Sequence, residues 1–382
     1  MLTSACASLR RARVVVQRPF ASARTVVQRP FASVPSFPPV VDGRALFQHG
    51  ASHPEAAASI RHIDIALQTN GVFLLKNHGG SARLASEIDS LARLFWSLPR
   101  DVKARLQRGD KTTRGWTDNE LTKRRLDLKE LYGYGAQGGC FDSAEGDGVD
   151  GANRFFSDAD EVTYAIGGMR AALARHFAES QRIGRRLVEA MAVALGRADD
   201  EVDNLVRGHN SFAVLNYFAA GRAGSELDGS GLGVSPHTDA GLVTLLRLDD
   251  VSGLEILVRA RRADGSAAAG DDHFGDVRAG DVWMEVPPPE PNVLVVNLGD
   301  MAQVWSNDRW HAAVHRVRSP ATRDRYSHAH FVNPNEKAKF GGVVSPRYRS
   351  FRWADFRAAR AKGDALDIGA EVQIAQYRTH VR

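Results

Sequence analysis

The spacing of apolar residues changes partway along this chain of 382 residues. Over residues 54–69 and 81–107, apolar positions recur at intervals near 3.6, as on one face of an amphipathic helix. These segments predict a helix-rich N-terminal half. A longer stretch of the same kind runs from about Val162 to Leu195, and its apolar side carries Leu173, Leu187, Met191 and Leu195.

From Ser211 onward the pattern becomes short apolar runs separated by Gly, Asp and Pro, which is typical of β-strands. Eight such runs suit a double-stranded β-helix (jelly roll), in which two sheets enclose a cavity. The predicted fold is mainly β with flanking helices: a jelly-roll core with a helical N-terminal extension. The predicted strands are Phe212–Phe218, Gly233–Thr238, Val243–Leu248, Leu254–Val258, Val282–Val286, Val293–Asn297, Ala313–Arg318 and Ser327–Val332.

Three further segments have a distinct composition. Gly133–Gly151 is rich in Gly and acidic residues and is predicted to be a loop, and Arg259–Gly280 is predicted to be an insertion between two strands. The C-terminal part, Trp353–Tyr377, is predicted to be helical and to cover the barrel.

The net charge of +5 comes from the first residues of the chain. Residues 1–41 hold six arginines and no Asp, Glu or Lys, so the remainder carries 5 − 6 = −1. A nearly neutral body offers no basic surface for nucleic acid, and no apolar run approaches the roughly 18 residues of a transmembrane helix. We therefore expect neither nucleic acid nor a membrane as a partner.

The N-terminal segment, residues 1–37, has the composition of an organelle transit peptide, since it is rich in Arg, Ser and Ala and lacks acidic residues. It contains the duplicated sequence VVQRPFAS, and Arg-Pro-Phe followed by Ala-Ser resembles sites cut by the mitochondrial processing peptidase, after Phe20 or Phe31. A mitochondrial location is expected, with a plastid as the alternative. Cys6 in this leader and Cys140 are the only cysteines, which leaves no disulfide framework.

The sequence His237-Thr238-Asp239 is the first sign of chemistry. Side chains alternate along a strand, so His237 and Asp239 should share a face while Thr238 points away. With His315 from a distant strand, they would form the two-histidine, one-carboxylate facial triad of non-haem Fe(II) oxygenases, which leaves coordination positions open.

Arg325 and Ser327 follow His315 at a distance that allows a turn and the start of another strand. A guanidinium fork suits a carboxylate, and the Ser327 hydroxyl should lie on the same strand face. The triad with this Arg-x-Ser pair predicts a site for Fe(II) and 2-oxoglutarate. The alternative is a zinc site using His311 and His315, four apart as on a helix, but the general-base Glu of that motif is replaced by Ala312.

These residues carry a family resemblance. The segment from Leu215 to Pro334 resembles the catalytic core of the Fe(II)/2-oxoglutarate dioxygenases related to isopenicillin N synthase. The resemblance covers about residues 38–350 and implies four parts: the leader (1–37), a helical extension (38–205), the jelly-roll domain (206–337) and a C-terminal helical segment (338–382). The matching motifs are PHTD at 236–239, GLVTLL at 241–246, GLEI at 253–256, VVNLGD at 295–300, WSN at 305–307, HRV at 315–317, RYS at 325–327 and, in the N-terminal half, PVVD at 39–42, GVFLLKNHG at 71–79, FWSLP at 95–99 and DLKE at 127–130.

The resemblance implies that 2-oxoglutarate binds the metal through its keto acid while its far carboxylate reaches Arg325 and Ser327. It also places Asn216 and Tyr217 in the family's Asn-Tyr-Tyr-Pro region, next to the co-substrate, although Phe218 here replaces the second tyrosine. The implied reaction uses O₂ to oxidise, by default hydroxylate, a small organic substrate and releases succinate and CO₂. Two alternatives stay open: an iron oxidase that does not use 2-oxoglutarate, and a non-catalytic jelly-roll binding protein.

Four aromatic or polar residues are candidates for lining the substrate pocket, or equally for packing within the core. They are Tyr132, Tyr134, Phe331 and Asn333.

Overall fold

The computed structural model describes residues 37–109, 112–122, 125–136, 150–222, 231–260, 277–363 and 372–379. Contacts divide the chain into residues 1–35 and 36–382, and everything below concerns the second unit. The predicted leader, apart from Phe37, lies outside the described residues, as do Cys140 and most of the predicted insertion. The transit peptide and its cleavage sites therefore stay predictions.

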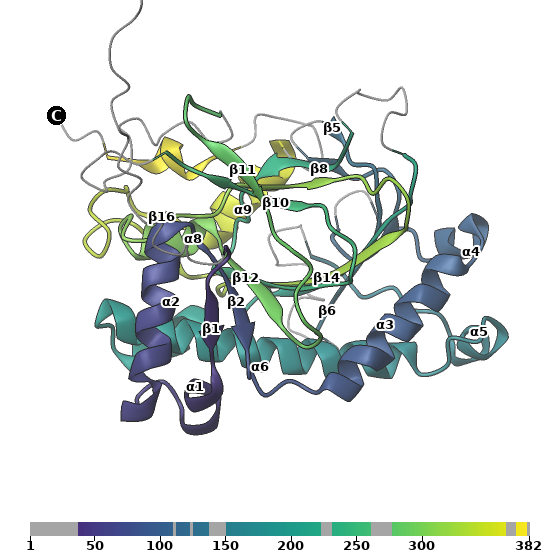
Figure 1. The fold of residues 1–382 in the computed structure, drawn as a ribbon, viewed down its shortest axis with the longest axis horizontal. Helices are drawn as coiled ribbons and strands as arrows, with labels where there is room; N and C mark the ends of the chain where they lie inside the picture. The colour runs from purple at the N-terminus through teal and green to yellow at the C-terminus, as the bar shows by residue number, and fades with distance from the viewer. Residues whose placement is uncertain are drawn as a thin grey trace, which may run out of the picture. The chain divides into compact units, whose positions relative to one another are not determined.

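Two facing sheets form the core, as predicted (Figure 1). The four-stranded sheet has the order β11-β10-β13-β8, and the middle of the eight-stranded sheet has the order β12-β9-β14-β7. All eight predicted strands are present, with ends within two residues of the prediction, and the jelly roll is confirmed. They are β7 (Phe212–Phe218), β8 (Leu232–His237), β9 (Val243–Leu248), β10 (Leu254–Val258), β11 (Val282–Glu285), β12 (Leu294–Leu298), β13 (His315–Arg318) and β14 (Arg325–Val332).

The large sheet is extended at both ends by strands from the N-terminal half. At one end β1 (Val40–Asp42) pairs in parallel with β2 (Val72–Lys76), which joins β12. At the other end β6 (Glu130–Gly135) joins β7, and β3 (Gly115–Thr117) forms the edge. Two short pairs complete the strands: β4 (Leu121–Thr122) with β5 (Arg125–Leu126), and β15 (Lys339–Phe340) with β16 (Phe351–Arg352).

Strand β6 corrects the predicted loop at Gly133–Gly151. Residues Gly133 to Gly135 belong to the strand and pair with β7. A Cβ atom at Gly133 would lie 1.9 Å from the carbonyl oxygen of Thr113, so glycine is required here by the close approach of another backbone. Glycine is also common in loops, which is why the sequence predicted a loop at this position. Residues 137–149 lie outside the described residues.

Helices flank the sheets. The predicted helices over 54–69 and 81–107 are present, each divided into two elements. The helical elements are α1 (Arg44–His49), η1 (Pro54–Ala56), α2 (Ala57–Thr69), α3 (Ala82–Ser97), α4 (Arg100–Ala104), α5 (Asp158–Thr163), α6 (Met169–Leu195), α7 (Asp199–Val206), α8 (Asp300–Trp305), α9 (Trp353–Gly363) and η2 (Ile374–Tyr377).

The single helix predicted from Val162 to Leu195 is wrong, because the chain breaks between α5 and α6. Gly168 adopts φ = +83° at the start of α6, a left-handed conformation that interrupts the helix. The Glu161 carboxylate accepts hydrogen bonds from the backbone N–H groups of Gly168 and Arg170, at 2.9 and 3.0 Å. It thereby satisfies donors that the first turn of α6 leaves free.

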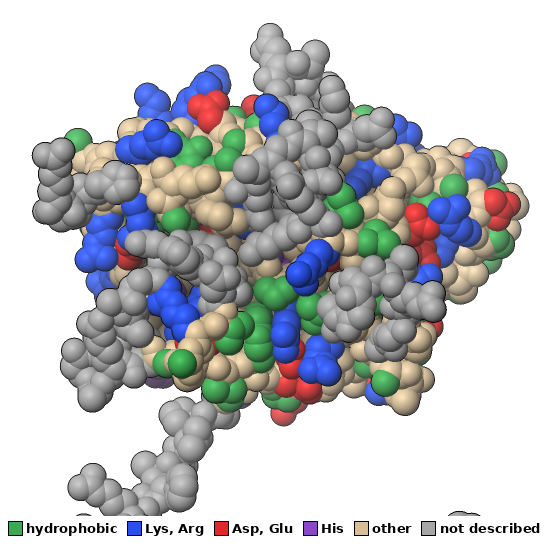
Figure 2. Space-filling view, turned by 90° about the horizontal axis from the view of Figure 1, so that it is seen from above, with side chains coloured by type: hydrophobic (Ala, Val, Ile, Leu, Met, Phe, Trp, Pro, Cys, Tyr) green, Lys and Arg blue, Asp and Glu red, His purple; other side chains and the backbone are tan. Residues whose placement is uncertain are grey.

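Helix α6 lies across the large sheet (Figure 1). Leu173, Leu187 and Met191 are each 1% exposed, which confirms the predicted apolar side of this helix. None of the described helices has the length and hydrophobicity needed to cross a bilayer. On the face drawn in Figure 2, Lys and Arg side chains are scattered with Asp and Glu side chains among them.

The contact between α6 and β14 yields a test of the packing. A Cβ atom at Gly184 would lie 2.4 Å from a methyl group of the buried Val332. The substitution Gly184→Val should therefore lower the free energy of unfolding by roughly 1–3 kcal/mol through overpacking. The measurement is the urea midpoint at unchanged slope. Gly167→Ala is the control, since a Cβ there meets nothing within 4 Å and should change the midpoint little. An unchanged midpoint for Gly184→Val would show that α6 can move away from the sheet.

Candidate metal centre and its cavity

Three side chains converge at one end of the small sheet, two from its strands and one from the turn after β8. His237 is the last residue of β8, and His315 is the first residue of β13 and pairs with it across the sheet. Asp239 follows β8, and its Oδ1 atom lies 3.7 Å from His237 Nε2 and 3.8 Å from His315 Nε2. All three donor atoms lie within 4.8 Å of one another, as the facial triad requires.

The outward nitrogen of each imidazole is bound to the backbone. His237 Nδ1 lies 2.8 Å from the Ser235 carbonyl oxygen, and His315 Nδ1 lies 3.0 Å from that of Ala313. Because a carbonyl only accepts hydrogen bonds, Nδ1 of each ring carries the proton and Nε2 presents a lone pair to the centre. Burial lowers the pKa of His237 to about 3, so this imidazole is neutral, as a metal ligand must be.

Asp239 is oriented in the same way. Its Oδ2 atom accepts hydrogen bonds from Thr244 Oγ1 and from Asn297 Nδ2, at 2.5 and 2.7 Å, which leaves Oδ1 to face the two imidazoles. Burial raises the pKa of Asp239, whereas the charge that either neighbouring histidine would carry if protonated and these hydrogen bonds lower it, and the net shift is below its usual value. The carboxylate is therefore ionised. Thr244 and Asn297 lie within the matched motifs, but no local pattern around them indicates this role.

Arg325 is the second feature of the site. It opens β14 opposite Phe218 of β7 and is 1% exposed, with its guanidinium carbon 5.0 Å from the centre of the Phe218 ring. Its Nε and Nη1 atoms have no hydrogen-bond partner among the described residues. Burial lowers the pKa of Arg325 to about 10, so the group is still a cation at neutral pH. The Asp249 carboxylate acts on Arg325 through space and raises its pKa, but it takes no hydrogen bond from these two donor atoms. They are free for a further anion, and a planar fork fits a carboxylate.

One cavity of about 270 Å³ joins these features. It is lined by the triad, by Arg325 and Ser327 and by Asn216, and the roles expected for these residues toward metal and co-substrate stay predictions. The structure does not place Tyr217 in this cavity, where it was expected to lie next to the co-substrate. As the neighbour of Asn216 on β7 it points to the opposite face, where its hydroxyl donates to Asp324 Oδ2 at 3.0 Å and its ring stacks on Trp96.

Of the four candidates for lining the substrate pocket, two lie in the cavity and two lie in the core. Phe331 and Asn333 line the cavity. Tyr132 and Tyr134 do not: both are 1% exposed within the core, and their hydroxyls contact the Arg154 carbonyl oxygen and His176 Nδ1. Sequence reasoning missed several lining residues from distant elements, because nothing local signals which segment will close a cavity. They are Lys129 of the segment before β6 and Trp353, Arg357 and Arg360 of α9.

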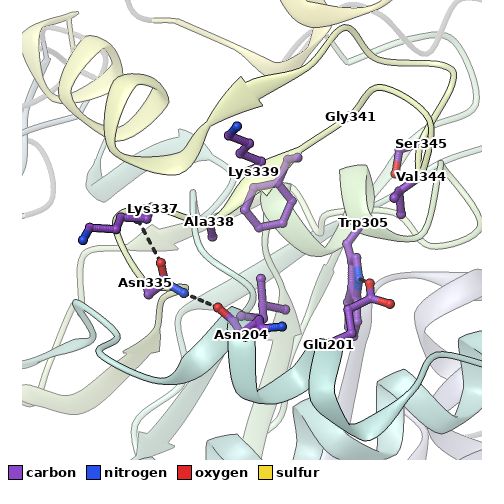
Figure 3. A pocket seen from close by; sticks show the side chains of 12 residues that line it. Glu201, Asn204, Trp305, Asn335, Lys337, Ala338, Lys339, Gly341, Val344 and Ser345 are labelled. Atoms are coloured by element: carbon purple, nitrogen blue, oxygen red, sulfur yellow. Dashed lines mark hydrogen bonds between the residues drawn. The ribbon is translucent and has the colours of Figure 1, made fainter.

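Two other places in the described part of the chain resemble sites at first sight. His49, His53 and Glu55 also bring donor atoms within 4.8 Å, but all three are exposed. A pocket of about 360 Å³ beside α7 and β15 contains Glu201, which accepts a hydrogen bond from the Trp305 indole at 2.7 Å (Figure 3). The described residues of this pocket bring no second acid, histidine or cysteine beside Glu201. Within the described ranges, only the cavity above combines oriented metal donors with a buried cation.

Comparison with known proteins agrees with this geometry. Residues 209–334 match the 2OG-Fe(II) oxygenase superfamily, and residues 38–157 match the N-terminal family of the non-haem dioxygenase in morphine synthesis. The chain is 27% identical to the 2-oxoglutarate-dependent dioxygenase ecdK of Aspergillus rugulosus over 327 residues, which cover 78% of this chain and 92% of that protein.

Two solved structures show the same fold. A full-length protein of Neurospora crassa in complex with α-ketoglutarate has a TM-score of 0.67 at 20% identity, covering 84% of this chain and 94% of that one. JOX2 in complex with 2OG, Fe and JA has a TM-score of 0.65 at 21% identity, covering 89% of each chain.

Removing one imidazole tests the metal centre. His237→Ala deletes one of three donors, and we expect it to weaken binding of Mn(II), a redox-stable substitute for Fe(II), by roughly 100-fold or more. Electron paramagnetic resonance of free Mn(II) measures this directly. His62→Ala, at an exposed position of α2, is the matched control. Wild-type affinity in a folded His237→Ala protein would remove this residue from the metal site.

Proposed function

This chain belongs to the 2OG-Fe(II) oxygenase superfamily. We propose that the enzyme binds a small organic molecule in this cavity and oxidises it, with hydroxylation as the default reaction. It is a 2-oxoglutarate-dependent dioxygenase, an oxidoreductase that uses Fe(II). The observation that carries its use of 2-oxoglutarate is Arg325: a buried guanidinium with two free donor atoms in the same cavity as the triad. In the overall reaction the substrate, O₂ and 2-oxoglutarate give the oxidised substrate, succinate and CO₂.

The residues present fit the iron. We assign His237, Asp239 and His315 as its three ligands, with the opposite coordination positions left to the cavity. Ferrous ion in such a site activates O₂, while 2-oxoglutarate supplies two of the electrons needed as it loses CO₂. The carbonyl groups of Ser235 and Ala313 keep the two imidazole donors in place.

At the other end of the cavity, Arg325 and Ser327 would bind the far carboxylate of 2-oxoglutarate. Phe218 contributes no hydrogen bond, but its ring lies against the guanidinium and supports it by a cation–π contact. Apolar side chains that line the same cavity would exclude water from it, and this would strengthen an ion pair with the bound carboxylate. These side chains are Val234, Leu246, Leu254 and Val317.

The substrate is proposed to lie near the far end of β14. Phe331, six residues beyond Arg325, stacks on Phe212 of the neighbouring strand at 4.6 Å between ring centres. Lys129 faces the same cavity, and its Nζ atom lies 3.0 Å from Asp127 Oδ2. An ammonium group has three donors, so those not used by Asp127 can bind a substrate oxygen. An apolar body with one oxygen-bearing group suits this lining.

Titration of the metal-free protein tests the assignment. Fe(II) and 2-oxoglutarate, added together without O₂, should give the weak visible charge-transfer band of the chelate, whereas either alone should not. A protein that binds Fe(II) but never shows the band would favour the alternative, an iron oxidase that does not use 2-oxoglutarate. Screening small molecules for stimulated succinate formation then identifies the substrate.

Arg325→Ala should raise the 2-oxoglutarate concentration required for half-maximal turnover by about 30-fold or more. Truncating one partner of a buried, hydrogen-bonded charge pair costs about 2–5 kcal/mol of binding free energy. Mn(II) affinity without 2-oxoglutarate should stay unchanged. Arg323→Ala is the matched control, since Arg323 is exposed and pairs with Asp250. An unchanged requirement in Arg325→Ala would assign the carboxylate to another residue.

The leader supports a second proposal, that residues 1–37 direct the protein to mitochondria, with plastids as the alternative. The support is compositional: six arginines and no acidic residue over residues 1–41. A fluorescent protein fused after residue 37 should enter mitochondria, and the same fusion to the chain from residue 38 should not.

A further inference from the structure

The C-terminal helix reaches the turn that carries two of the three proposed ligands. Arg360 of α9 is 5% exposed, and its Nη2 atom donates to the carbonyl oxygen of Thr238 at 2.8 Å. Thr238 lies between His237 and Asp239. In the same guanidinium, Nη1 donates to Asp300 Oδ2 at 2.5 Å. Figure 1 shows α9 next to α8, which begins at Asp300.

Asp300 also contacts the same turn. Its backbone N–H donates to the carbonyl oxygen of Asp239 at 2.8 Å. The carbonyl groups of Thr238 and Asp239 are therefore each held by one member of the Arg360–Asp300 pair. Gly299 allows this approach, because a Cβ atom there would lie 2.3 Å from the Gly241 carbonyl oxygen and 3.0 Å from that of Asp239.

These contacts matter because the sheet does not hold Asp239. Strand β8 ends at His237, whose partner in β13 is His315, so the ladder fixes both histidines. Asp239 lies beyond the last pair, and the position of its backbone depends on bonds made by the turn. The Arg360–Asp300 pair supplies two of those bonds.

We propose that Arg360 is a positioning residue for the metal site, which holds the turn 237–239 so that the Asp239 carboxylate meets the two imidazoles. This inference rests on the proposed metal ligands. The planar fork is essential to the role, since two separate nitrogens address two acceptors in a fixed geometry, whereas the three donors of a lysine ammonium all lie on one nitrogen. Metal affinity thus depends on a helix at the far end of the chain.

Three variants separate positioning from simple anchoring of α9. Arg360→Gln should weaken Mn(II) binding by about 10-fold or more, the range found for residues that orient metal ligands. It should also lower the unfolding temperature, because it leaves the buried Asp300 carboxylate without its cation. Adding Asp300→Asn should restore much of the unfolding temperature but not the Mn(II) affinity, since the contact to Thr238 is still missing. Arg360→Lys should keep most of the unfolding temperature and still bind Mn(II) more weakly than the wild type.

Binding is measured by electron paramagnetic resonance of free Mn(II), and stability by thermal unfolding of the metal-free protein. Lys362→Ala removes an exposed cation from the same helix and should change neither. If both Arg360→Lys and the double variant bind Mn(II) within threefold of the wild-type affinity, Arg360 only anchors α9. These two variants also distinguish positioning from anchoring if Arg360→Gln does not fold. If His237→Ala also binds Mn(II) normally, the metal site itself is wrong.

Discussion

Each donor of the metal centre is oriented by a hydrogen bond made on its outer side. The two histidines use backbone carbonyls two residues earlier in the chain, Ser235 and Ala313. Asp239 uses Thr244 and Asn297. Without these bonds the side chains could turn their lone pairs elsewhere, and the cavity would contain three polar groups rather than a ligand set. The jelly roll matters to function because it brings those outer partners into place.

Arg325 shows the opposite arrangement, a buried charge left incomplete. Burial of a cation whose donors lack hydrogen-bond partners destabilises the protein, and the Phe218 ring and the charge of Asp249 offset part of that cost. The same free donors would give the co-substrate a strong binding site if, as proposed, its far carboxylate binds Arg325. The folded protein is therefore expected to become more stable when 2-oxoglutarate binds, because any ligand that binds only the native state shifts the unfolding equilibrium towards it.

Much of the fold and part of the site could be predicted from the sequence. The eight core strands follow from short apolar runs between turn residues, and a spacing of two places Arg325 and Ser327 on the same face of β14. Such patterns are local, so the chain displays them directly. The strand that carries His237 ends before Asp239, so alternation along a strand does not by itself place Asp239. The N-terminal strand β6 and the break before α6 were missed, because Gly133 and Gly168 serve a close approach and a left-handed turn that depend on distant residues.

What the sequence alone determined is therefore the set of elements, the chemistry of the ligands and the alternation of side chains along each strand. Tertiary structure decided which face of β7 looks into the cavity, which excluded Tyr217, and it buried Tyr132 and Tyr134 in the core. It also brought α9 against the metal-binding turn. The physical reason is that periodicity is a property of neighbours in sequence, whereas the closure of a cavity depends on packing between segments that the chain separates widely.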